Sequence, residues 1–386
     1  MIINHFTDND LYKFTAMNAI QKLYPKAMVR YNFINRGHTL FPDGFARKLR
    51  KEVDSFADIV LSREEEKFLV SRCYYFDPVF IDLLKGYRYD PSEVRIDEKD
   101  GVLEVEIEGL WYRTVLWEVP LLALISELFF NLKGNQPQEV EEKAAEKALK
   151  MNEMKAEYSD FGTRRRFSFD VHNRVVGTFM EYSPEFFKGT SNIYIAMKHN
   201  LIPIGTHPHE WFMFHASSFG YRSANAMALN AWVEVYKGDL GIALSDTYTS
   251  ENFFSSFSVL HAKLFDGIRQ DSGDPLAFTD RALEFYQQNR IDPETKTIVF
   301  SDALDLDKIF GIRQYVRGRI HDVYGIGTYL TNDVGVQPLN IVIKMTGSKL
   351  DPADDFHPAV KLSDDPGKYT GDPAEIQVCK SVLNLI

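Results

Sequence analysis

Short apolar runs recur through the second half of the chain, and each ends in polar or charged residues before a helical pattern begins. The clearest runs cover 241–246, 267–271, 297–302, 323–328 and 340–344. The helical patterns between them cover about 252–264, 277–289 and 305–318. This alternation predicts parallel β-loop-α units.

Further apolar runs at 193–196 and 201–205 bring the total to six or seven strands between about 160 and 345. That number favours a (β/α) barrel over a short open sheet. Polar residues lie at the carboxyl ends of four strands: Asp246, Asp271, Asp302 and Thr328. The carboxyl ends of barrel strands form the rim that holds the active site in such enzymes. We therefore expect the functional site at this rim.

The first third of the chain predicts mixed α and β structure. The patterns indicate a helix at 10–24 capped by Asp8 or Asn9, a strand at 26–35, a hairpin at 94–107 and helices at 119–130 and 138–156. The helix at 138–156 is charged and alanine-rich, so we expect it on the outside. The tail from 346 is rich in Asp, Pro and Gly and predicts loops with one short helix.

Charge restricts the kind of partner. The chain of 386 residues has 44 Lys and Arg against 55 Asp and Glu, and its net charge is -11. A general nucleic-acid binder is normally basic, because phosphate contacts supply most of its affinity. We therefore expect no nucleic-acid partner. An anionic substrate would need a local pocket of arginines.

The compartment is predicted from cysteine usage and from apolar segments. The two cysteines, Cys73 and Cys379, lie far apart with no CxxC pattern, which suits a reducing compartment and excludes a disulfide scaffold. The N-terminal residues lack the basic and apolar regions of a signal peptide. The longest apolar stretch, 115–130, is too short and too polar for a bilayer. The sequence therefore predicts a soluble cytoplasmic protein with no membrane partner.

Two motifs contain clustered basic residues, arginines in one and histidines in the other. Residues 161–166 (FGTRRR) place three arginines beside a Gly-Thr loop, which suits carboxylate or phosphate oxygens; a solvated basic turn is the alternative. Residues 205–211 (GTHPHEW) place His207 and His209 two apart, with His215 further along. Such histidines can bind a metal, carry a proton, or act as a nucleophile beside Glu210. They can also be ordinary loop histidines.

Two more motifs follow strands of the predicted barrel. Residues 269–275 (RQDSGDP) could hold Mg²⁺ with a phosphorylated sugar, or form a salt-bridged turn. Residues 325–328 (GIGT) are small and late in the barrel, where backbone N–H groups commonly bind phosphate. The pattern does not match the GxGxxG fingerprint, because Leu330 occupies the sixth position, so we infer no dinucleotide-binding unit.

Eight motifs in fixed order resemble the nicotinate phosphoribosyltransferase family of the bacterial and yeast type. They are DNDLYKFTAM (8–17), FGTRRR (161–166), KGTSN (188–192), GTHPHEW (205–211), RQDSGDP (269–275), FSDALD (300–305), YGIGT (324–328) and PLNIVIK (338–344). The resemblance covers nearly the whole chain. Each motif alone is a weak signal, whereas the ordered set is specific.

The resemblance implies an α/β fold, an irregular (β/α) barrel of the type II phosphoribosyltransferase kind with an N-terminal α+β domain. We expect the N-terminal domain at 1–135, the barrel at 136–345, and a C-terminal segment at 346–386 that packs on the N-terminal domain. It also implies a homodimer whose active sites take residues from both chains.

The implied reaction joins nicotinate to phosphoribosyl pyrophosphate, yields nicotinate mononucleotide and pyrophosphate, and is coupled to ATP hydrolysis in NAD salvage. The resemblance makes His209 the residue that ATP phosphorylates, with Asp271 and Arg269 as further catalytic residues. Mg²⁺ is expected to accompany phosphoribosyl pyrophosphate and ATP near Asp271 and Asp302, without tight direct ligation.

The resemblance also implies substrate-binding residues. We expect Arg164 and Arg269 to hold the carboxylate and phosphates, and Phe161 to sandwich the pyridine ring with Tyr12 of the partner subunit. The other residues expected to bind substrate are Thr190, Ser191, Ser301, Asp302, Gly325, Gly327 and Thr328, of which the glycines and Thr328 would receive the 5′-phosphate.

Ser191 predicts the choice of base, and the histidines leave a second function open. Related enzymes that use the amide have an acidic residue after the Gly-Thr pair, so serine here favours nicotinate over nicotinamide. The competing hypothesis is a metal-dependent barrel hydrolase with His207, His209 and Asp302 as ligands. Against it, barrel hydrolases usually have H-x-H on their first strand, whereas here it lies in mid-chain. A ligand-binding protein without turnover is a third possibility.

Overall fold

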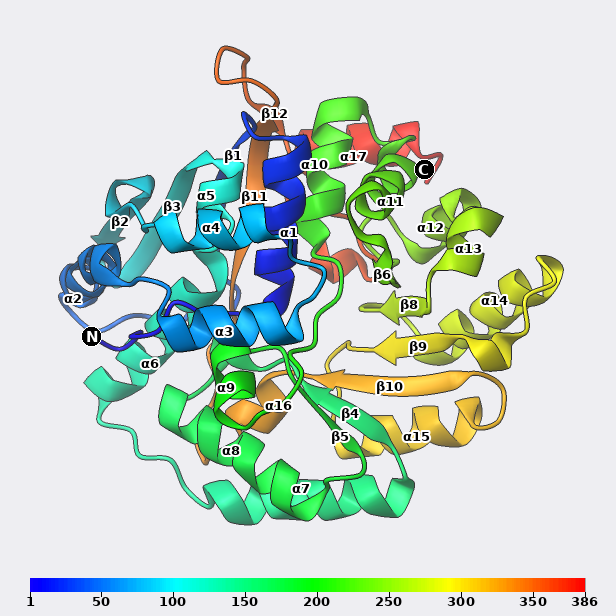
Figure 1. Cartoon of the computed structure of the whole chain (residues 1–386). Helices are drawn as coiled ribbons and strands as arrows, with labels where there is room; N and C mark the ends of the chain where they lie inside the picture. Colours follow the sequence, from blue (N-terminus) through cyan, green and yellow to red (C-terminus); the bar gives the residue numbers. More distant parts are fainter. Residues whose placement is uncertain (386) are drawn as a thin grey trace.

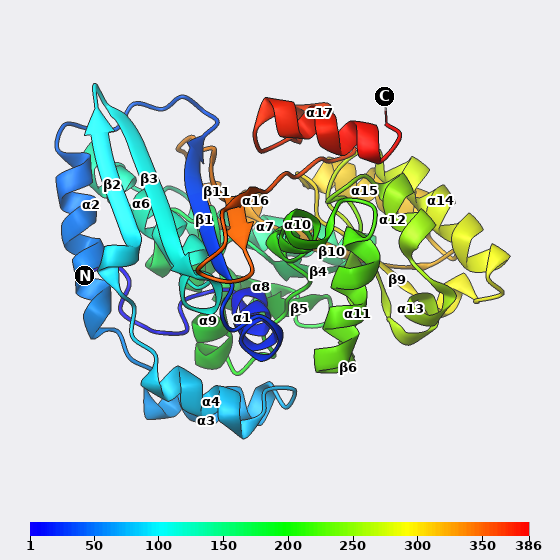
Figure 2. The same ribbon diagram turned by 90° about the horizontal axis from the view of Figure 1, so that it is seen from above.

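Two β-sheets organise the chain (Figure 1). The computed structural model describes residues 1–385. One sheet is antiparallel, with strand order β12-β11-β1-β3-β2, and the other is parallel, with order β5-β4-β10-β9-β8-β7. Figure 2 shows β1, β2 and β3 on one side of the molecule and helices α12, α13 and α14 on the other. This mixed α/β architecture agrees with the fold class expected from the sequence.

The antiparallel sheet contains most of the elements predicted for the first third. Its N-terminal strands are β1 (Met28–Asn35), β2 (Val94–Lys99) and β3 (Val102–Leu110). The predicted hairpin turns at Asp100 and Gly101, both with positive φ, as two-residue hairpin turns require. The helices of this part are α1 (Leu11–Leu23), α2 (Phe45–Asp54), α3 (Arg63–Arg72), α4 (Pro78–Gly86), α5 (Trp111–Thr114) and α6 (Glu118–Lys133).

The start of α1 differs from the prediction in its cap. Asp10, not Asp8 or Asn9, occupies the N-cap position, and its side chain makes no capping hydrogen bond. The reason is that its carboxylate accepts hydrogen bonds from Thr163 and Ser191 instead. Asp8 pairs with Arg166. The acidic residues before α1 therefore connect it to the parallel sheet.

The helical segment Trp111–Lys133 is longer than the apolar stretch considered in the sequence. Its length and composition would suffice for a membrane crossing, so the argument from shortness and polarity was wrong. However, 83% of its apolar window is buried inside the protein. This segment, which consists of α5 and α6, therefore belongs to the core of the protein.

The parallel sheet forms the wall of the irregular barrel. Its strands are β4 (Glu157–Asp160), β5 (Phe187–Thr190), β7 (Ile242–Leu244), β8 (Gly267–Gln270), β9 (Thr297–Phe300) and β10 (His321–Ile326). The flanking helices are α7 (Val140–Met154), α8 (Phe169–Tyr182), α14 (Pro275–Gln288) and α15 (Leu306–Val316); in Figure 1, α7, α8 and α15 lie below the strands and α14 lies to the right. Within residues 1–385 the pairing does not close between β5 and β7. Instead, an irregular segment passes β5, where Ile204 N donates to Thr190 O at 3.0 Å.

Two predicted strands of the barrel were wrong. Residues 193–196 lie in helix α9 (Ile193–Lys198), because the Asn192 side chain caps the N–H of Ile195 and starts a helix there. Residues 201–205 form no strand. The true strands at this edge, β4 and β5, have only four residues each and include polar and glycine positions, so their pattern is weak.

The run at 340–344 was also assigned to the wrong sheet. It begins β11 (Ile341–Lys349), which pairs antiparallel with β1 from Asn35↔Ile341 to Met28↔Lys349. A central strand buried on both faces has the same continuous apolar pattern in either kind of sheet, so pattern alone could not separate them. The predicted helix at 252–264 is two helices, α12 (Ser250–Ser256) and α13 (Val259–Leu264), because Ser258 caps a new start.

The C-terminal segment contacts both parts of the molecule. Strand β12 (His357–Pro358) extends the antiparallel sheet beside β11. Leu362 N donates to Thr247 O in the barrel, and α17 (Pro373–Val382) places Glu375 against Tyr221. The remaining elements are α10 (His209–Phe219), α11 (Ala224–Tyr236), β6 (Lys237–Leu240) and α16 (Thr328–Thr331). The domain borders at 135 and 345 stay a prediction.

Candidate active site

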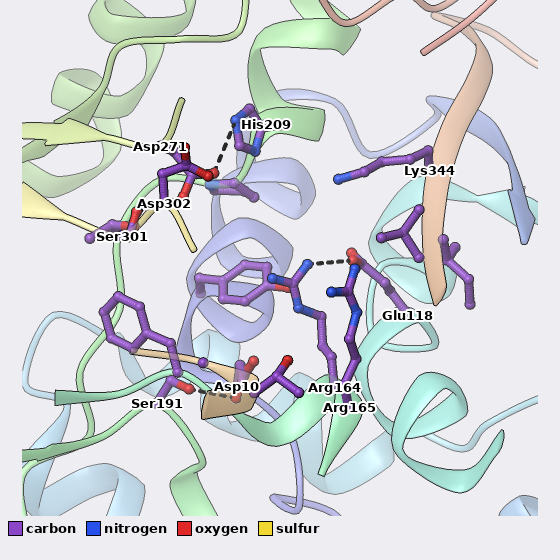
Figure 3. A pocket seen from close by; sticks show the side chains of 18 of the residues that line it. Asp10, Glu118, Arg164, Arg165, Ser191, His209, Asp271, Ser301, Asp302 and Lys344 are labelled. Carbon is purple, nitrogen blue, oxygen red and sulfur yellow. Dashed lines mark hydrogen bonds and ion pairs between the residues drawn. The ribbon is translucent and has the colours of Figure 1, made fainter. Parts of the chain in front are cut away.

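A cavity of about 710 Å³ lies at the carboxyl ends of the parallel strands, next to the antiparallel sheet (Figure 3). Seven basic side chains line it, namely Arg36, Arg164, Arg165, Arg269, Lys344, Lys361 and Lys368. Six acidic side chains also line it, namely Asp10, Glu118, Glu210, Asp271, Asp302 and Asp305. The cavity is thus far less acidic than the chain, whose net charge is -11. A local basic pocket of this kind is what an anionic substrate requires.

His209 is the first residue of α10, and a buried carboxylate orients its ring. Its Nε2 donates to Asp246 Oδ1 at 2.7 Å, and Asp246 lies at the carboxyl end of β7. Asp246 Oδ2 accepts from Ser272 at 2.8 Å and from Lys361 at 3.0 Å. Burial lowers the pKa of His209 to about 4, with Lys361 adding to the shift. His209 is therefore neutral at pH 7, with the proton on Nε2 and the lone pair on Nδ1.

Arg269 and Asp271 lie at the end of β8 and share Ser301. Arg269 donates to Asp271 at 2.8 Å, to Ser301 at 2.7 Å and to Thr206 at 2.8 Å. Ser301 donates to Asp271 at 2.6 Å. Although burial opposes ionisation, Arg269 holds the pKa of Asp271 below its usual value. The structure thus brings the predicted residues Arg269, Asp271 and Ser301 together. Asp271 Oδ2 also lies 3.6 Å from His209 Nε2.

The possible metal ligands are present, but lysine side chains already balance the charge of some of these carboxylates. One ligand atom each from His209, Asp246 and Asp271 lies within 4.8 Å of the others. Asp302 pairs with Lys368, and its carbonyl oxygen accepts from Lys308. Mg²⁺ usually binds one or two carboxylates together with substrate phosphates and water. Asp271 and Asp302 fit such a shared, substrate-borne ion.

The three consecutive arginines have different roles. Arg164 lines the cavity and donates to Glu118 at 3.4 Å. Arg165 also lines it and donates to Ile341 O at 2.8 Å. Arg166 is fully buried and forms a two-bond ion pair with Asp8 at 2.6 and 2.7 Å. Only the first two can therefore meet a substrate, and the third holds the N-terminal segment.

Tyr12 lines the cavity of its own chain. The sequence interpretation expected this residue from a partner subunit, whereas in this single chain Tyr12 already lines the cavity. The tyrosine is in the first turn of α1, which Asp10 anchors to the barrel through Thr163 and Ser191. Phe161 lines the same cavity, with the Arg269 guanidinium 5.9 Å from its ring centre. One chain thus supplies both aromatic side chains.

Ser191 reaches the cavity but Thr190 does not. Ser191 donates to Asp10 Oδ1 at 2.7 Å, and burial raises the pKa of Asp10. Thr190 is buried and donates to Asp160 at 2.5 Å, outside the cavity lining. Its predicted substrate contact is therefore not direct in this structure, because its hydroxyl is committed to Asp160.

The glycine-rich end of β10 reaches the cavity only in part. Gly327 and Thr328 line the cavity where α16 begins. Gly325 lies behind Phe161, and a Cβ there would come within 2.3 Å of the ring. Gly325 thus makes room for the aromatic side chain and is not itself part of the cavity lining, so its contact with phosphate stays a prediction.

His207 does not join His209 in a metal site. Its ring packs 4.5 Å from the Trp232 ring, and burial lowers its pKa to about 3, with Arg269 adding to the shift. His209 turns instead to Asp246. The set of His207, His209 and Asp302 proposed for a hydrolase is therefore not assembled.

Several residues of the cavity were missed in the sequence. Asp246 was recognised as a strand end but given no role, and its partner Lys361 lies in the tail. Lys344 lies on β11, within a quoted motif, yet nothing marked its side chain as facing a cavity. Glu118 begins α6, where a buried helix gave no sign of a charged contact. These residues come from distant segments, so only the fold reveals their proximity.

Comparisons with known proteins agree with the motifs. The nicotinate phosphoribosyltransferase (NAPRTase) family matches residues 156–385, and its N-terminal domain matches 7–126. A nicotinate phosphoribosyltransferase of Chromohalobacter salexigens is 50% identical, covering 100% of this chain and 99% of its own. A structure of the Porphyromonas gingivalis enzyme aligns with a TM-score of 0.97 at 45% identity, over 99% of this chain and 100% of that one. A structure of the Vibrio cholerae enzyme aligns with a TM-score of 0.92 at 32% identity, over 100% of this chain and 94% of that one.

Proposed function

The chain belongs to the nicotinate phosphoribosyltransferase family, and we propose how the residues of its cavity perform that reaction. It is a transferase of NAD biosynthesis, in a family that uses ATP and phosphoribosyl pyrophosphate as substrates. The metal-dependent hydrolase hypothesis is not supported.

His209 accepts the γ-phosphoryl group of ATP on Nδ1. The observation that carries this proposal is the hydrogen bond from Nε2 to the buried carboxylate of Asp246. That bond fixes the proton on Nε2 and leaves a nucleophilic lone pair on Nδ1. As Nδ1 bonds to phosphorus, the bond to the bridging oxygen breaks and ADP leaves.

The environment of His209 suits the phosphorylated form. A phosphoryl group adds about two negative charges. It would lie at the N-terminus of α10, an 11-residue helix whose free N–H groups favour an anion. Lys361 is within 3.0 Å of the carboxylate that orients the ring. Hydrolysis of the phosphohistidine after synthesis releases phosphate and resets the site.

The nicotinate site lies between the aromatic and the arginine side chains. Phe161 and Tyr12 of one chain would stack on the pyridine ring, and Arg164 or Arg269 would pair with its carboxylate. Ser191 donates to Asp10, so no further carboxylate faces the base from that position. An acidic residue there would repel nicotinate, which supports a preference for the acid over the amide.

The transfer step needs positioning and charge rather than a further covalent intermediate. The anomeric carbon gains oxocarbenium character as pyrophosphate departs, and the pyridine nitrogen forms the new bond to it. Arg269 and Asp271 would hold the ribose side with Ser301, and Gly327 and Thr328 would receive the 5′-phosphate. Mg²⁺ would arrive with phosphoribosyl pyrophosphate and reach Asp271 or Asp302.

The cysteine usage and the cavity lining bear on the compartment and the oligomeric state. We expect the enzyme to act in the cytoplasm, as its cysteine usage suggests. We also expect a homodimer, but catalysis should not require the second subunit, because Tyr12 lines the cavity of its own chain. If the protein is active at a concentration where mass photometry shows only monomer, the active site does not need residues of a second subunit.

Mapping the phosphoryl group tests the proposal. Protein incubated with ATP and Mg²⁺, without nicotinate, should contain acid-labile phosphate on His209. The His209→Ala variant should contain none, and it should keep only slow synthesis at high substrate concentration without stimulation by ATP. Phosphate on another residue, or equal labelling of the variant, would contradict the role of His209.

A further inference from the structure

A buried lysine connects the two halves of the active site. Lys13, on α1, is fully buried, and its ammonium group pairs with both Glu118 and Glu210. Glu118 begins α6 and Glu210 is the second residue of α10. Three helix starts therefore meet at one ammonium group.

Each carboxylate also contacts a different side of the cavity. Glu118 accepts from Arg164 at 3.4 Å, on the side assigned to nicotinate. Glu210 directly follows His209, on the side assigned to ATP. Lys13 itself follows Tyr12, and its ammonium lies 5.3 Å from the Tyr12 ring centre. Figure 3 shows Glu118 and Arg164 in contact across the cavity from His209.

The surroundings leave Lys13 little freedom to move. Glu210 also accepts from the Tyr31 hydroxyl, and from the Trp111 indole at 3.4 Å. Within residues 1–385, Lys13 is the one ion-pair partner of Glu210, whereas Glu118 has Arg164 as a second, longer partner. Although burial opposes it, Lys13 and Arg164 hold the pKa of Glu118 at about 2. Glu118 is therefore ionised at pH 7, and the two ion pairs of Lys13 hold the cluster in one arrangement.

We propose that Lys13 is a positioning residue that fixes the Arg164 side of the site relative to the His209 side. It touches no substrate and acts through Glu118 and Glu210. Its loss leaves two facing carboxylates without their shared cation, so both Arg164 and the start of α10 shift. Misplacement of about 1 Å can cost on the order of 100-fold in rate. Transfer to nicotinate therefore slows, whereas the phosphohistidine still forms and hydrolyses. The consequence is ATP hydrolysis without product.

The test compares Lys13→Met with Arg313→Met. Both changes remove a cation from a buried carboxylate, because Arg313 pairs with Asp322 at the amino end of β10. That end is opposite the cavity, so Arg313 serves as the stability control. We expect Lys13→Met to lower kcat/KM for nicotinate about 100-fold and to raise the ADP released per mononucleotide. Arg313→Met should keep the wild-type ratio.

The outcomes separate this inference from the proposed function on which it rests. A wild-type enzyme without ATP-stimulated synthesis would refute the ATP coupling itself. If the wild type is coupled and Lys13→Met keeps the wild-type ADP released per mononucleotide and the wild-type kcat/KM for nicotinate, only the role of Lys13 is refuted. A similar change in Arg313→Met would also refute it. If Lys13→Met does not fold, Glu118→Gln keeps the shape and removes the charge, and an unchanged ratio in that variant would overturn the proposal.

Discussion

Replacing Asp246 by asparagine should disable His209 by moving its proton. Asp246 Oδ1 faces His209 Nε2, whereas Oδ2 accepts from both Ser272 and Lys361. Lys361 is a pure donor, so the amide oxygen must face it. The NH₂ group then faces His209 Nε2, which can only accept. The ring proton moves to Nδ1, and the lone pair needed for phosphorylation is lost.

The substitution should affect both the rate of phosphorylation and the stability of the fold. In a serine protease, the corresponding change beside the catalytic histidine lowers kcat about 10⁴-fold through the wrong tautomer. We expect the rate of His209 phosphorylation in Asp246→Asn to fall about 10³- to 10⁴-fold. Lys361 is also left in a buried place without its carboxylate, and breaking such a pair costs about 3–5 kcal/mol of stability. The assay must therefore include a check of folding.

Rapid-quench measurement of phosphohistidine from ATP tests this directly, with circular dichroism at the assay temperature as the folding check. Ser272→Ala is the matched control, because it removes one neutral donor from the same carboxylate. That loss is about 1 kcal/mol, so its rate should stay within about tenfold of wild type. A folded Asp246→Asn protein that phosphorylates at the wild-type rate would refute the reasoning.

Three other changes probe the base and the cavity wall. Ser191→Asp places a second carboxylate beside Asp10, so the ratio of kcat/KM for nicotinate over nicotinamide should fall about tenfold or more; comparable use of both bases by the wild type would contradict the premise. Gly325→Ala would force its Cβ to 2.3 Å from the Phe161 ring, so KM for nicotinate should rise about tenfold as the ring shifts; an unchanged KM would argue against the stacking role. Burial lowers the pKa of Lys344 to about 7, although Glu118 opposes the shift, so its charge is present below that pH and lost above it. Lys344 lies with Glu118 and Arg164 on the nicotinate side of the cavity. KM for nicotinate, measured from about pH 6 to about pH 9, should therefore rise with pH in the wild type and stay flatter in Lys344→Met; equal profiles would exclude a role for this charge.

Much of the fold could be predicted because the apolar pattern repeats with polar strand ends. Asp246, Asp271, Asp302 and Thr328 do follow β7, β8, β9 and β10, as their spacing indicated. The sheet membership of 340–344 could not be predicted, because a buried central strand has the same pattern in either sheet. The short strands β4 and β5 have too few residues for a periodic signal.

The candidate site was predicted where chemistry and motif coincide and missed where the fold alone brings residues together. His209, Arg269 and Asp271 were named from motifs, and their contacts now explain their grouping. Lys361 lies 115 residues from Asp246 in the chain, and no local pattern relates the two. Thr190 and Gly325 lie within the right motifs, yet their contacts are with Asp160 and Phe161. A motif therefore locates a site but does not assign each side chain.

The measurement that tests the account most directly is mononucleotide formation from phosphoribosyl pyrophosphate and Mg²⁺, with nicotinate and nicotinamide offered in parallel, with and without ATP. The arrangement of His209, Arg164 and Phe161 in one cavity predicts product from nicotinate in excess over nicotinamide, with synthesis stimulated by ATP in wild type and unstimulated in His209→Ala. Product that does not depend on nicotinate, or ATP stimulation that survives in His209→Ala, would contradict it.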